Sequence, residues 1–255
     1  MLAVRSAQIR VFDDAAWQQF EDEMVIHSRE FSPRLCEVLG EKQVRVAVGG
    51  AIQRARAFGF TCRGPVRLYV ELMFLCGSGF ATDPQYPILG KVLLDSADQM
   101  ARAERLHEEV LRYQEKVAGP DACNVRRALG KLLGLSQKPV AYTREGLVAG
   151  LLGDMHEGFP ERAGYIGDAA LTALIAEGRA EAQKHEFPSP RGEALLVTLM
   201  FAFGHECTHD PLYPWIERTL QDEKIVAPAA RAARLERKAV TWLNHVLDQR
   251  PAGDS

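Results

Sequence analysis

The chain has 255 residues, of which 47% are hydrophobic and 25% charged, and a formal net charge of -3. This composition excludes disorder as the main state and gives no overall basic field for nucleic acid. No run approaches about 18 apolar residues and the start lacks a signal-peptide pattern, so we expect neither a membrane span nor secretion. Five scattered cysteines without a CxxC pair suit a reducing compartment, and we expect a cytoplasmic protein.

The N-terminal quarter is predicted to be mostly helical. Residues 1–11 are expected to form an extended arm. Apolar residues then recur at three- and four-residue steps over 17–31, which predicts an amphipathic helix. A short helix over 33–40 follows, with proline at its start and glycine at its end. The valines of 41–58 would suit a strand, but the later apolar spacing is helical, so we predict a helix.

A buried helix and two amphipathic elements are predicted next. Residues 66–76 are apolar on nearly every side, which is typical of a central helix. Asp83 is then expected to cap a new segment that begins at Pro84. A short helix over 88–94 and a long amphipathic helix over 100–117 complete this part.

A linking helix is expected over 124–135, followed by an irregular connector over 137–143. The same order of elements then returns. The predicted helices cover 169–184, 193–203, 215–220 and 229–247. Residues 249–255 are polar and are expected to fray.

One turn motif occurs twice, at an offset of 127 residues and without a gap. Met73, Phe74, Gly77, Asp83, Pro84, Tyr86 and Pro87 correspond to Met200, Phe201, Gly204, Asp210, Pro211, Tyr213 and Pro214. We therefore predict an all-α protein with an internal duplication, whose two similar helical halves pack about a pseudo-twofold axis. The expected division is an arm and helix start at 1–23, repeat one at 24–119, a linker at 120–148, repeat two at 149–248 and a tail at 249–255.

The second turn contains an H-E-x-x-H motif at His205, Glu206 and His209. On a helix the two histidines would face one way and bind zinc, with the glutamate as general base. The first copy has Ser78 and Thr82 in place of the histidines, and a glycine and a proline bracket the motif and disfavour a helix. We expect a polar loop without metal or cofactor, and a zinc hydrolase remains an alternative.

Other residues of the two turns have structural explanations as well as functional ones. Cys207 could be a nucleophile, but a partly buried thiol is the simpler interpretation. Asp83 and Asp210 resemble an acid pair, yet their place before proline suits caps. Tyr86 and Tyr213 are held rigidly between prolines and could anchor a partner protein or pack in the core. We expect no catalytic residue.

The divergence between the two turns favours the second as the binding surface. We expect the 205–215 loop to contribute more to partner binding than the 78–88 loop, because the second copy adds polar and aromatic residues that the first lacks. The candidate partner-binding residues are Asp83, Tyr86, His205, Glu206, His209, Asp210, Tyr213 and Trp215.

Three stretches carry a resemblance to a known group of proteins. They are Ala7-Gln8, the run Phe-x-Asp-x-Met-Val-x-His at 20–27, and Met-Phe-x-x-Gly-x-x-Phe-x-x-Asp-Pro at 73–84. Together they resemble small helical proteins encoded in bacterial type VI secretion clusters, beside spike, PAAR-tip and effector genes. The resemblance covers most of the chain and implies an accessory role, but no catalytic residues.

We therefore expect a non-enzymatic accessory protein that loads a secreted effector as a co-chaperone or adaptor. Its partner would be the effector, the effector's chaperone or a spike or PAAR component, with no nucleic acid and no membrane. An alternative is a cytoplasmic immunity protein that neutralises a cognate toxic effector.

Overall fold

The structure is a computed structural model that describes residues 6–136, 142–187 and 189–247. Within these residues the fold is all-α and contains no strand, as the sequence predicts. None of the helices in the described ranges is long and apolar enough to cross a membrane. The expected connector and tail fall almost wholly outside the described residues.

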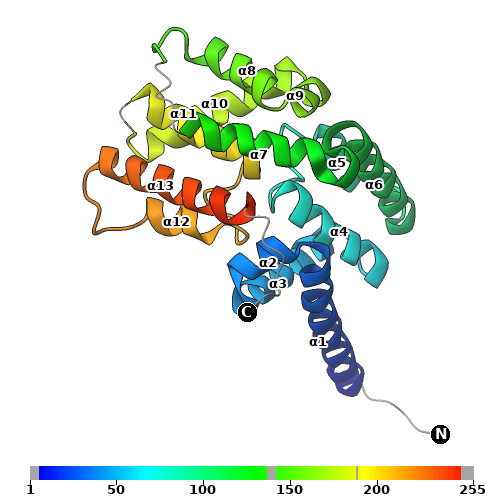
Figure 1. Ribbon diagram of the computed structural model, residues 1–255. Helices are drawn as coiled ribbons and strands as arrows, with labels where there is room; N and C mark the ends of the chain where they lie inside the picture. Colours follow the sequence, from blue (N-terminus) through cyan, green and yellow to red (C-terminus); the bar gives the residue numbers. More distant parts are fainter. Residues whose placement is uncertain (1–5, 137–141, 188, 248–255) are drawn as a thin grey trace, which may run out of the picture.

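The first helix corrects the expectation of an extended arm. α1 already begins at Ser6 and continues to Phe31. Residues 6–31 contain neither glycine nor proline, the residues that most disfavour a helix interior, so the helix continues through this N-terminal part. In Figure 1 the first turns of α1 extend away from the other helices.

The predicted helices of the first half are present, including the helix over 41–58 and the buried helix over 66–76. Their bounds are α2 Pro33–Leu39, α3 Glu41–Ala57, α4 Arg63–Cys76, α5 Pro87–Leu93 and α6 Gln99–Tyr113. A π-helical turn over Gln114–Ala118 extends α6, and a short 3-10 helix over Pro120–Ala122 leads into α7, Cys123–Ser136. α7 matches the predicted linking helix.

The second half repeats this order of elements. Its bounds are α8 Leu147–Gly158, α9 Pro160–Ile166, α10 Asp168–Lys184, α11 Pro190–Phe203, α12 Pro214–Leu220 and α13 Pro228–Leu247. The helices α9 to α12 begin and end 127 residues after α2 to α5, without exception. The offset of the sequence motif is therefore also the offset of the helix boundaries.

Both halves contribute to one hydrophobic core. Val44, Leu72 and Phe80 of the first half and Leu171, Leu196 and Cys207 of the second are fully enclosed members of it. α3 packs on α4 as α10 packs on α11, and α7 lies across the second half against α13 and α8 (Figure 1). The buried helices α4 and α11 end directly before the two loops that lie between the halves.

Candidate functional site

The two turns that carry the repeated motif, residues 77–86 and 204–213, face each other. We call them the paired loops. Each begins at a glycine with positive φ, +92° at Gly77 and +98° at Gly204. A Cβ on Gly77 would lie 2.5 Å from the carbonyl oxygen of Phe203, and one on Gly204 would lie 2.9 Å from that of Cys76. Only glycine fits this backbone-to-backbone approach.

The aspartates of the paired loops bind the opposite loop. Asp83 Oδ2 accepts a hydrogen bond from the backbone N–H of His205 at 2.8 Å. Asp210 Oδ2 accepts one from the backbone N–H of Ser78 at 2.7 Å. The other carboxylate oxygens accept the N–H groups of Gln85 and Leu212, each at 2.8 Å. Each loop therefore supplies acceptors that the other loop needs.

These bonds correct the expectation that the aspartates cap helices. The next helices begin later, at Pro87 and Pro214, with tyrosines at the N-cap positions. Both carboxylates are only 2% exposed. Burial raises the pKa of Asp83 and Asp210, while the backbone hydrogen bonds partly oppose the shift. Their role in this structure is to join the paired loops.

The H-E-x-x-H residues lie in a turn and not on a helix. His205 Nδ1 lies 3.0 Å from Glu177 Oε2, and its Nε2 lies 3.2 Å from the carbonyl oxygen of Gly79. His209 Nδ1 lies 3.3 Å from Glu217 Oε1. Each histidine thus faces a different carboxylate.

The glutamate of that motif also has a charged neighbour. Glu206 faces Arg54 at 3.8 Å and covers Gly79 of the first loop, where a Cβ would lie within 2.8 Å of three of its atoms. Among the described residues, no group of three or more His, Cys, Asp and Glu side chains is arranged to hold a metal ion.

Cys207 is enclosed, and burial raises its pKa well above the ordinary value, which keeps the thiol protonated and unreactive.

The aromatic residues proposed for partner binding are largely core residues. Tyr86 and Tyr213 are 5% and 7% exposed. The Tyr213 ring stacks on Phe203 with centroids 4.4 Å apart, and Trp215 is half-buried beside them. The surface that this second loop offers to solvent consists chiefly of Glu206 and His209.

The structure adds two polar residues that the sequence analysis did not identify. The buried Arg162 on α9 donates to Gln85 Oε1 at 3.0 Å and to the Tyr86 hydroxyl at 2.8 Å. At an offset of 127 residues, Leu35 and Leu212 stand at these positions, and both are buried. Aligning the sequence with itself at this offset shows that Gln85 and Arg162 stand where the other copy has leucine.

A surface hollow of about 570 Å³ lies beside Tyr86, between the end of α4, α5, α6 and α9. Leu75 and Ile88 line it and are 40% and 46% exposed. Tyr113 and Tyr165 add aromatic walls. Charged residues lie around this apolar lining, namely Glu109, Arg112, Lys116 and Glu161.

Comparisons with protein-family models, with curated proteins and with solved structures give no significant match to this chain.

Proposed function

We propose that this chain is a non-enzymatic, protein-binding accessory protein of a type VI secretion system that loads a secreted effector in the cytoplasm. The observation that carries the proposal is the surface hollow beside Tyr86. Its exposed aliphatic residues and tyrosine walls lie among charged residues, which is the composition of a protein–protein contact with an apolar centre and a polar rim. The sequence resemblance supplies the kind of partner.

The proposed occupant of the hollow is an apolar anchor side chain of an effector, its chaperone or a spike or PAAR protein. Ile88 and Leu75 would contact this anchor directly. Removing such a contact at an interface centre costs about 2 kcal/mol or more, which is about thirtyfold in affinity. Glu206 and His209 of the second loop do not line the hollow and would form a separate contact with the partner.

We further propose that the two halves arose by internal duplication and pack about a pseudo-twofold axis. The constant offset of helix boundaries from α2 and α9 to α5 and α12 supports this. So does the exchange of hydrogen bonds, because Asp83 and His205 bond just as Asp210 and Ser78 do, with donors and acceptors at equivalent positions.

The test uses the full chain co-purified with the proteins encoded beside it. Ile88→Asp should weaken capture of its partner by about thirtyfold. Leu94→Asp is the matched control, since Leu94 follows α5, is 78% exposed and lies outside the hollow. If Ile88→Asp folds and binds as tightly as the parent, the hollow is not the contact. The double variant Glu206→Ala/His209→Ala tests the second loop in the same assay.

Deletion of the gene separates an adaptor from an immunity protein. Loss of an adaptor stops effector delivery and leaves the cell healthy. Loss of an immunity protein inhibits the cell through its own toxin, and that outcome would replace the loading role with neutralisation.

A further inference from the structure

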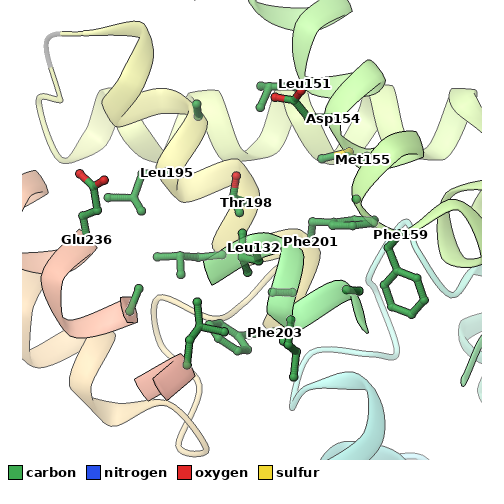
Figure 2. Close-up of a pocket in the computed structure, with 18 of the residues that line it drawn as sticks. Leu132, Leu151, Asp154, Met155, Phe159, Leu195, Thr198, Phe201, Phe203 and Glu236 are labelled. Carbon is green, nitrogen blue, oxygen red and sulfur yellow. The ribbon is translucent and has the colours of Figure 1, made fainter. Parts of the chain in front are cut away.

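A second cavity, of about 210 Å³ and partly open to solvent, lies between α7, α8, α11 and α13 (Figure 2). Its walls are mainly aliphatic and aromatic. Leu132 of α7, Leu195 of α11 and Val240 of α13 contribute to them. A dry apolar cavity of about 150 Å³ already holds benzene, so this space is large enough for a small apolar ligand. α7 has no counterpart in the first half, and the cavity is therefore a feature of the second half alone.

Three of the four charged residues that line the cavity have a hydrogen-bonding or ion-pair partner beside them. Arg191 Nη2 lies 2.5 Å from Glu236 Oε1, which neutralises both side chains. The Tyr142 hydroxyl donates to the Asp154 carboxylate. The Arg191–Glu236 pair is therefore neutral overall, whereas Asp154 keeps its negative charge and has the Tyr142 hydroxyl as its donor.

The fourth, Arg162, differs from the other three. Its hydrogen-bond partners are the neutral groups of Gln85 and Tyr86, and its buried Nε has no partner within the described residues. Its guanidinium carbon lies 5.0 Å from the centroid of Phe201, which also lines the cavity. The Asp83 carboxylate acts on it electrostatically but bonds elsewhere.

A buried arginine with a free donor is costly unless a further acceptor is supplied. The fold itself does not require the charge, because the equivalent Leu35 is apolar and equally buried. Guanidinium groups are well suited to carboxylates.

The cavity wall also holds an unused hydroxyl. Thr172, Thr219 and Thr241 each donate to the carbonyl four residues earlier in their helix. Thr198 makes no hydrogen bond within the described part of the chain, and its side chain lines the cavity (Figure 2). It offers a second polar contact in an otherwise apolar wall.

We propose that this cavity binds a medium-chain fatty acid, with its carboxylate at Arg162 and its acyl chain against Leu132, Leu195 and Val240. The apolar walls match the chain, and the unpartnered Nε of the buried Arg162 matches the head group. The inference does not depend on the proposed accessory function.

Isothermal titration of the delipidated full chain with octanoate and with 1-octanol tests the proposal. The two ligands share a chain length and differ in head charge. Octanoate should bind at least about tenfold more tightly, as expected for a hydrogen bond to a buried charged group. Equal affinities would overturn the head-group assignment, and no binding of octanoate would overturn the site.

Two variants locate the ligand. Leu195→Trp fills the cavity and should abolish binding, whereas Leu68→Trp, at the half-buried equivalent position on α4, should leave it unchanged. The double variant Gln85→Leu/Arg162→Leu places leucines where the equivalent positions carry Leu212 and Leu35, which favours folding. It should bind octanoate and 1-octanol equally. Retained octanoate binding by folded Leu195→Trp, or a retained preference for octanoate in the double variant, would contradict the proposal.

Discussion

Gly77 and Gly204 lie so close together that a Cβ on either would overlap the backbone carbonyl oxygen that precedes the other. A Cβ on either would lie within 3.4 Å of the other's Cα. Both have φ and ψ values that are almost restricted to glycine. The contact thus fixes how α4 and α11 end relative to each other.

Gly77→Ala should therefore be strongly destabilising. Backbone strain costs about 1–3 kcal/mol, and the overlap with the carbonyl oxygen of Phe203 adds a further ~2 kcal/mol. Gly40→Ala is the matched control, because Gly40 has a similar backbone conformation and nothing within 4 Å of its Cβ position. Urea denaturation should show a clearly larger loss for Gly77→Ala. Equal losses would mean that the close approach is not energetically important.

The buried aspartates should give the protein a distinct pH dependence. Burial raises the pKa of Asp83 and Asp210 in the folded state above the ordinary value of 3.8. The folded protein then takes up protons before the unfolded chain does as pH falls. The contribution of these two groups to the free energy of unfolding should increase as pH falls through the raised pKa values, and should decrease again as pH rises.

The comparison is between the parent and Asp83→Asn/Asp210→Asn, by urea denaturation from about pH 7 to about pH 4. The free energy of unfolding of the parent should rise relative to that of the variant at the acidic end of this range. Asp98→Asn removes a carboxylate at an exposed helix N-cap and controls for net charge. A difference that is constant over this range would contradict the role of burial.

Arg162 and Gln85 should be energetically coupled. Arg162→Leu leaves the Gln85 carbonyl and the Tyr86 hydroxyl without their donor, at a cost of about 1–3 kcal/mol for each buried group. Gln85→Leu/Arg162→Leu removes the amide as well and places leucines at both positions, as at the equivalent Leu212 and Leu35. We expect the double variant to be at least ~1 kcal/mol more stable than the sum of the single changes implies. Additive losses in a double-mutant cycle would show that the pair acts independently.

The H-E-x-x-H residues should not retain zinc. His205 and His209 contact different carboxylates, Glu177 and Glu217, so their rings are not directed at one ion. Metal analysis of protein purified without chelators should give well below one zinc per chain. Stoichiometric zinc that disappears in His205→Ala or His209→Ala would overturn this expectation.

Most helices could be predicted because their signals are local. Apolar spacing located α3, α4, α6 and α13, and the repeated motif showed which glycines end the buried helices. The arm was wrong because its β-branched residues received more weight than the uninterrupted sequence of α1.

The candidate site was harder to predict because its bonds are long-range. The caps were assigned wrongly because a local rule for Asp-Pro was applied to Asp83, whose partner His205 is 122 residues away. The burial of Tyr86 and Tyr213 likewise depends on packing against other helices, through Tyr113 and Arg162 for Tyr86 and through Phe203 and Trp242 for Tyr213. Arg162 and Gln85 had an available signal, since leucines stand at their equivalent positions.

The exchange of hydrogen bonds between the paired loops has a consequence for how the chain folds and for what each half can do alone. Contacts such as those of Ser78 with Asp210 close a loop of 132 residues, so they form after the helices and depend on both halves being present. A separated second half would expose both the N–H of His205 and the carboxylate of Asp210. In two copies of that half, the N–H of His205 in each copy could donate to the Asp210 carboxylate of the other. Fragments cut within 137–141 should therefore reassemble when mixed, and the second fragment alone should form a twofold homodimer.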